Sequence, residues 1–202
     1  MTSPVPPAAD EPVYDDRVYR SPMAMVTGVL MLALVCWLCG DALVRGSGSA
    51  PWIAGAVLVC GVPLIVAFTL RPAVFANDNR MRVRNPFRTI ELPWAAVDAV
   101  RAGYSAEVLA EGAKYQLWSI PVSLRERKKA NRRAARAAAA DVAVADASGA
   151  GADKVVHELT ELAERGAARA GAQGSVKVRW SYEIIAPAAI GAVALIVLLA
   201  TR

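Results

Sequence analysis

The stretch Met23–Gly40, MAMVTGVLMLALVCWLCG, runs for 18 residues without a charged side chain. Two further stretches share this character: Pro51–Leu70, PWIAGAVLVCGVPLIVAFTL, with 20 residues, and Ile184–Ala200, IIAPAAIGAVALIVLLA, with 17. A helix needs roughly 17–25 residues to cross a hydrocarbon core about 30 Å thick. The apolar residues are concentrated in these stretches rather than spread at helical period, which disfavours buried helices of a soluble protein. The sequence therefore predicts three transmembrane helices.

The basic residues that flank the three stretches predict an orientation. Nine lysines and arginines lie beside the ends that would share one side: Arg17, Arg20, Arg71, Arg80, Arg82, Arg84, Arg88, Lys177 and Arg179. Only Arg45 and Arg202 lie beside the opposite ends. Because cytoplasmic flanks carry the excess of positive charge, we expect a multi-pass protein of the inner (plasma) membrane. The N-terminus and the central region would be cytoplasmic, and the C-terminus would lie outside.

The interiors of the three stretches carry little chemistry. None contains Asp, Glu, Lys, Arg or His, the residues that mark proton relays and substrate paths in membranes. This argues against a transporter, a pump or an intramembrane protease. Cys36 and Cys39 form a C-x-x-C, but thiolate formation is disfavoured in an apolar setting, so we interpret them and Cys60 as small buried residues. Small residues such as Gly28 and Gly191 could allow close approach between helices.

The region between the second and third stretches predicts a small β-domain covered by a helix. Short runs rich in Val, Ile, Phe, Tyr and Trp alternate with turn residues, which is typical of antiparallel strands. We expect six strands, over 73–76, 80–84, 87–92, 96–104, 106–109 and 114–120. A half-buried sheet of this size needs cover, and the amphipathic segment Asp153–Ala170 could supply it. His157 lies within that segment without other ligand-type residues at metal-binding spacing, which favours a surface role.

One motif in this region resembles a known family. Residues 82–97 read RVRNPFRTIELPWAAV, with an R-V-R-N strand, a tight turn, an arginine-bearing strand and then P-W-x-x-V. This resembles the core of the bacterial PH-like domains of small actinobacterial membrane proteins, which include the low-molecular-weight protein antigen 6 group. The resemblance implies a seven-stranded barrel that a C-terminal helix closes. The six expected strands and a long insert before the helix depart from that pattern.

The resulting fold class is an α+β membrane protein, with three transmembrane helices and a cytoplasmic PH-like antiparallel β-barrel with a C-terminal capping helix. We divide the chain into a disordered cytoplasmic N-tail (1–21), a two-helix transmembrane hairpin (22–71), the PH-like domain (72–175), and a juxtamembrane segment with the third helix (176–202). The PH-like domain would include a basic helical insert (123–140) and a small-residue linker (141–152).

Two groups of basic residues are the candidate sites. Arg80, Arg82 and Arg84 alternate along one strand and so share one face of it, with Arg88 on the next strand. In the insert, six cations fall within an arc of about 140° on a helical wheel: Arg125, Lys128, Lys129, Arg132, Arg133 and Arg136. Both groups could contact anionic phospholipid headgroups. Solvated surface charge and an acidic protein partner remain alternatives.

The sequence favours a non-enzymatic interaction module at the cytoplasmic membrane face. No phosphate loop, nucleophile elbow or zinc-binding motif is present, so we expect no catalytic residue, no metal and no cofactor. Specific nucleic-acid binding is not expected, because no recognition motif accompanies the basic residues. We expect no phosphoinositide pocket. An accessory subunit of a larger cell-envelope or transport complex, and a membrane-bound enzyme of unrecognised type, are the alternatives. A membrane-protein partner and a homo-oligomer are both compatible with the sequence.

The predicted orientation can be tested by thiol labelling in intact cells. In a background with Cys36, Cys39 and Cys60 replaced by serine, Ser47→Cys should react with a membrane-impermeant maleimide. Ser105→Cys should react only after lysis, because it lies in the region predicted to be cytoplasmic. The reverse labelling pattern would contradict the orientation.

Overall fold

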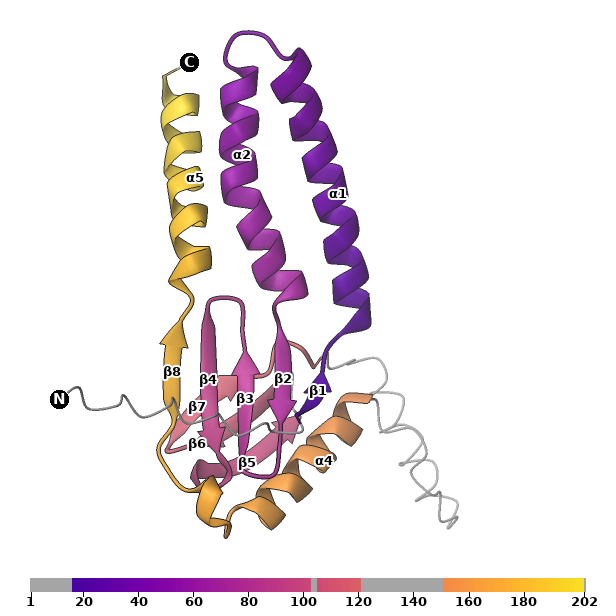
Figure 1. Ribbon diagram of the computed structural model, residues 1–202, viewed down its shortest axis with the longest axis vertical. Coiled ribbons are helices and arrows are strands. Elements are labelled where there is room, and N and C mark those ends of the chain that lie inside the picture. The colour runs from indigo at the N-terminus through magenta and orange to yellow at the C-terminus, as the bar shows by residue number, and fades with distance from the viewer. Residues whose placement is uncertain (1–15, 103–104, 121–150, 202) are drawn as a thin grey trace, which may run out of the picture.

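The computed structural model describes residues 16–102, 105–120 and 151–201. It shows a mixed α/β protein in which three long helices extend from one end of a β-rich module (Figure 1). These helices are α1 (Pro22–Arg45), α2 (Ala50–Ile65) with its π-helical continuation η1 (Val66–Leu70), and α5 (Tyr182–Ala200). Their mean hydropathy of 2.2 to 2.5 and their length are sufficient to cross a membrane. This suggests a membrane protein, as the sequence predicted.

Helix α2 packs against both α1 and α5, and glycines permit the close approach. A Cβ on Gly28 of α1 would lie 2.1 Å from Thr69 Oγ1 of η1, and a Cβ on Gly191 of α5 would lie 2.4 Å from the Cys60 nitrogen of α2. Helix α1 also continues past the predicted end at Gly40 as far as Arg45. The i,i+4 ion pair between Arg45 and Asp41, at 3.2 Å, spans this added turn.

The larger of two antiparallel sheets has five strands in the order β1-β2-β3-β4-β8. The strands are β1 (Arg17–Tyr19), β2 (Ala73–Ala76), β3 (Arg80–Arg84), β4 (Arg88–Pro93) and β8 (Lys177–Trp180). Its two outer strands correct the sequence analysis. We expected a disordered tail through residue 21, but residues 17–19 pair with β2. We expected a juxtamembrane segment from residue 176, but residues 177–180 pair with β4.

The smaller sheet has three strands in the order β5-β6-β7. These are β5 (Val97–Ala102), β6 (Ala106–Ala110) and β7 (Ala113–Gln116). Together with β2, β3 and β4 they account for the six predicted strands. The last predicted strand is shorter than expected, because it ends at Gln116 rather than at residue 120.

The expected barrel is not shown as a closed one. Strand β4 pairs with β3 along one edge and with β8 along the other, so neither edge is left for β5. The chain passes instead from β4 to β5 through the 3-10 turn η2 (Trp94–Ala96). Within the described residues the strands form two separate hydrogen-bonded sheets.

The core lies between the two sheets and under helix α4 (Gly151–Gly166), which covers the module on the side away from the long helices (Figure 1). Trp94 is fully buried in this core, and its indole nitrogen donates to the Asn77 carbonyl at 2.7 Å. Leu159 and Leu162 of α4 are buried in the same core, which confirms the predicted covering helix. The 3-10 turn η3 (Ala170–Ala172) then leads toward β8. The predicted insert at 123–140 lies outside the described residues, as does most of the predicted linker.

The strand directions place all three long helices at the same end of the larger sheet, which we call the helix-bearing end. Strand β1 runs directly into α1, η1 runs directly into β2, and β8 runs directly into α5. Because β1 and β2 are antiparallel, the end of one lies beside the start of the other. Strands β2, β3, β4 and β8 alternate in direction, so β8 also finishes at this end.

The central role of Trp94 gives a stability prediction. Trp94→Ala should lower the free energy of unfolding by about 3–5 kcal/mol, because it leaves a cavity in the core and removes the bond to Asn77. Thermal unfolding of the detergent-purified protein would measure the loss. Trp37→Ala is the control, because Trp37 is 77% exposed on α1 and should change stability little. Equal effects of the two substitutions would contradict this core.

Candidate functional site

The larger sheet has one face on the core and one open face. On β3, Met81 and Val83 are fully buried, while Arg80, Arg82 and Arg84 point to the open face, as the alternation predicts. On β4, Ile90 and Leu92 are buried, so Thr89 and Glu91 share the open face with the arginines. The register extends this face to β8, where Lys177 lies opposite Glu91 and Arg179 lies opposite Thr89.

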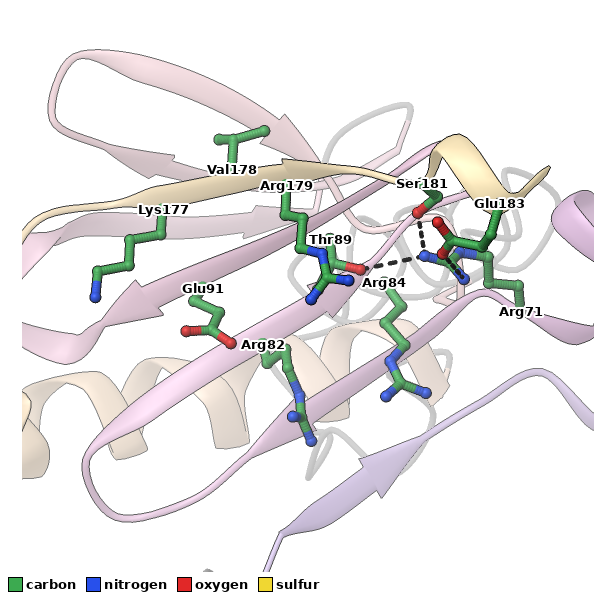
Figure 2. Close-up of a pocket in the computed structure, with 10 residues that line it drawn as sticks. All are labelled: Arg71, Arg82, Arg84, Thr89, Glu91, Lys177, Val178, Arg179, Ser181 and Glu183. Carbon is green, nitrogen blue, oxygen red and sulfur yellow. Dashed lines mark hydrogen bonds and ion pairs between the residues drawn. The ribbon is translucent and has the colours of Figure 1, made fainter. Parts of the chain in front are cut away.

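A cleft of about 470 Å³ lies on this open face, and we call it the cationic cleft (Figure 2). Thr89 and Glu91 of β4 form its floor. Its two sides carry cations from the neighbouring strands, and its end is formed where η1 ends and α5 begins. The lining residues are Arg71, Arg82, Arg84, Thr89, Glu91, Lys177, Val178, Arg179, Ser181 and Glu183. Five of the ten are cations and two are carboxylates.

Arg71 closes the cleft at the helix-bearing end. It follows η1 directly, and its guanidinium donates to the Ser181 hydroxyl, which directly precedes α5. The same guanidinium donates to Thr89 Oγ1 and to the Asn85 carbonyl, each at 3.3 Å. Its distance to a Glu183 carboxylate oxygen is 3.6 Å. Arg71 therefore joins the sheet to the end of η1 and to the start of α5.

The cations of the cleft differ in whether a carboxylate group lies beside them. Arg82 donates to Asp16 at 3.1 Å, and Arg80, just beyond the cleft, lies 3.8 Å from Glu91. Among the described residues, Arg84, Lys177 and Arg179 have no carboxylate partner, and these three form the uncompensated part of the cleft.

Arg84 rests in a strongly positive setting. Burial lowers the pKa of its guanidinium, and three neighbouring arginines lower it further. Its guanidinium and that of Arg82 each lie 4.9 Å from the centre of the Phe75 ring, and Arg20 lies 5.9 Å from it. The ring's negative face offsets part of the repulsion, by roughly 0.5–1 kcal/mol for each exposed contact. No full negative charge neutralises Arg84 within the described part of the chain.

The structure separates Arg88 from the other predicted site residues. Arg88 has the same strand parity as the buried Ile90, so it leaves the open face, and its guanidinium lies 5.8 Å from the Tyr115 ring centre on β7. The six basic residues of the insert lie outside the described residues. Sequence reasoning did not include Arg71, Lys177 and Arg179 in the site. It used them only as charges that flank the helices, because the pairing of β8 with β4 is invisible in a local pattern.

Aromatic residues fix the module against the end of α2. The Phe68 ring of η1 lies 5.3 Å from Phe87 in an edge-to-face arrangement, and 5.6 Å from Trp118. Phe87 precedes β4 and Trp118 follows β7, so both sheets contribute to this contact. The module is therefore packed onto the helices rather than only linked to them.

Metal-binding geometry is not found in the part of the chain that the structure describes. No group of three or more His, Cys, Asp or Glu side chains could hold an ion there. His157 is exposed on α4 and lies 3.2 Å from Glu161 of the same helix. The cationic cleft is accordingly the candidate functional site.

Comparison with known proteins supports the PH-like interpretation. Residues 71–150 match a family model described as a bacterial PH domain. The match covers β2 to β7 and continues beyond residue 120, outside the described residues. No curated protein and no solved structure matches the chain. A PH-like domain joined to three candidate membrane helices fits a membrane-associated interaction module.

The junction at Arg71 generates a second stability prediction. Arg71→Gln should lower the free energy of unfolding by about 2–3 kcal/mol, because hydrogen bonds from a charged donor to Ser181, Thr89 and Asn85 are lost. Arg88→Gln is the matched control, since it removes only a cation–π contact worth roughly 0.5–1 kcal/mol. Denaturant unfolding in detergent would compare the two. A larger loss for Arg88→Gln would contradict the junction.

Proposed function

We propose that this protein is a non-enzymatic membrane protein whose PH-like module binds the anionic lipid surface of the cytoplasmic leaflet. The observation that carries the proposal is the position of Arg84, Lys177 and Arg179. They lack carboxylate partners in the described residues, and they lie in a cleft whose end adjoins the end of one candidate membrane helix and the start of another.

The position matters because lipid electrostatics act over a short range. The attraction of a basic residue to an anionic leaflet is about 1 kcal/mol and falls off within a Debye length, about 8 Å at physiological salt. Arg71 directly follows η1, and Arg179 is three residues before α5. If the helices span the membrane as proposed, these cations stand at its surface.

The predicted basic insert (123–140) would also attract the module to the anionic leaflet. Its six cations belong to the module that the long helices hold at the membrane, and each would add to the attraction. An acidic membrane partner is the other occupant that fits the charge of the cleft, and the experiment below separates it from lipid.

Lipid selection by the purified protein tests the proposal. The full chain is exchanged into mixed micelles with equal amounts of phosphatidylcholine and phosphatidylglycerol, and the lipids that remain bound are quantified. We expect enrichment of phosphatidylglycerol. Arg84→Gln combined with Arg179→Gln should lower this enrichment on the order of 10- to 30-fold, because two attractions of about 1 kcal/mol each are lost.

The matched control replaces two exposed cations elsewhere in the module, Arg101 of β5 and Lys154 of α4, with glutamine. This variant has the same net charge as the test variant and should keep the enrichment. No enrichment in the parent protein, or equal losses in both variants, would overturn the proposed role of the cleft. A stoichiometric acidic protein that is lost only in the test variant would assign the cleft to a protein partner.

A further inference from the structure

We infer that the helix-bearing end of the cationic cleft is a discrete site for the phosphate-monoester headgroup of a membrane lipid. This inference rests on the proposed function and deepens it. General attraction to an anionic surface needs only positive charge, whereas a headgroup site needs donors that converge on one position. The geometry of β3, β4 and β8 supplies such a position.

The charges within the cleft place the anion above Thr89. At the far end of the floor, the Glu91 carboxylate would repel a phosphate, and it already lies near Arg80. At the helix-bearing end, Arg84, Thr89 and Arg179 form one row across three adjacent strands. Neighbouring strands are about 4.8 Å apart, so an anion over Thr89 has the backbone of one arginine roughly 5 Å away on each side. The Arg84 guanidinium lies over the Phe75 ring of β2 and would turn toward Thr89 to bind the anion.

The donors at this position suit phosphate oxygens. Thr89 Oγ1 accepts a hydrogen bond from Arg71, so its own hydroxyl hydrogen remains available as a donor. Guanidinium groups bind phosphate through two parallel hydrogen bonds, and Arg84 and Arg179 have no carboxylate partner among the described residues. Lys177 lies in the next row, opposite Glu91, so it adds charge to the cleft rather than a donor at this position. The site above Thr89 therefore offers hydroxyl and guanidinium donors together.

This excess of donors favours a monoester over a diester. A phosphate monoester carries a charge of about −1.5 to −2 near neutral pH and has three acceptor oxygens. A diester headgroup carries a single charge and has two free oxygens. Two arginines in the Thr89 row, with the charge of Lys177 in the next row, are better matched by the monoester. The pKa of Arg84 is lowered by burial and by neighbouring arginines, as expected for a guanidinium group without an anion beside it.

The position of the site selects a lipid rather than a soluble phosphate. Arg71 and Ser181 form the end of the cleft, and Arg71 directly follows η1 while Ser181 directly precedes α5. A headgroup bound there leaves its acyl chains beside the apolar helices. Phosphatidic acid is the simplest lipid with this headgroup.

Native mass spectrometry of the full chain in detergent can test the site with three probes. These are dioctanoyl phosphatidic acid, dioctanoyl phosphatidylglycerol and inorganic phosphate. We expect phosphatidic acid to bind at least tenfold more tightly than phosphatidylglycerol, and inorganic phosphate to compete only weakly. Arg84→Gln and Arg179→Gln should each weaken binding of phosphatidic acid by tenfold or more, while Arg101→Gln should not.

Thr89→Val distinguishes specific binding of the headgroup from general attraction to the positive charge of the sheet face. It keeps the shape of the side chain and the net charge but removes the hydroxyl donor. We expect it to reduce the preference for phosphatidic acid by several-fold, while binding of phosphatidylglycerol stays close to that of the parent protein. Because Thr89 Oγ1 also accepts a hydrogen bond from Arg71, the unfolding temperature should fall, but by less than in Arg71→Gln. An unchanged preference in this variant would overturn the site.

The outcomes distinguish this inference from the proposed function. Equal binding of the two lipids, with both lost in Arg84→Gln, would overturn the headgroup site and leave the proposed function standing. Binding of neither lipid would overturn both. Competition by inorganic phosphate at the same concentrations as phosphatidic acid would overturn the assignment to a lipid.

Discussion

The antiparallel pairing of β1 with β2 and of β4 with β8 ties all three apolar helices to one end of one sheet. Each helix continues a strand of the larger sheet, so the register of the strands determines where the helices can stand relative to one another. The contacts of Phe68 with Phe87 and Trp118, and those of Arg71 with Ser181 and Thr89, depend on this arrangement. The cationic cleft is formed by the same geometry, because its walls are β3 and β8 and its end is the junction with the helices.

The open face of the sheet concentrates like charges, which opposes folding. The cleft places five cations close together, although the direct cross-strand neighbours of those on β3 and β8 are Thr89 and Glu91 rather than further cations. Asp16 and the Phe75 ring relieve part of this repulsion at Arg82 and Arg84. On β8, Lys177 and Arg179 have no carboxylate partner among the described residues, so the repulsion there is not offset. A sheet face on which repulsion between cations is not offset is characteristic of a binding surface, because a bound ligand can supply the opposite charge.

Local patterns predicted much of the fold and part of the site. Arginine and apolar residues alternate strictly over Arg80–Arg84, and this alternation predicted the bounds of β3. The same reasoning applied to β4 would have separated Arg88 from the cleft, since it has the parity of Ile90 and Leu92. Strands β1 and β8 were not predicted, because three or four residues carry no readable period and their partners are far away in the sequence. The cations of β8 could not join the site until that pairing was known.

The strands of the larger sheet follow the order of the chain, but the smaller sheet and α4 intervene between β4 and β8, and this bears on how the protein is made. Strand β1 is synthesised before any of the long helices, and β8 is synthesised between α4 and the last helix. Until residues 177–180 emerge, β4 has an open edge and the cleft has only one wall. Long-range pairings of this kind form late, after the loops between them have closed. A chain that stopped early would therefore carry two helices and a partly formed sheet, but no finished binding surface.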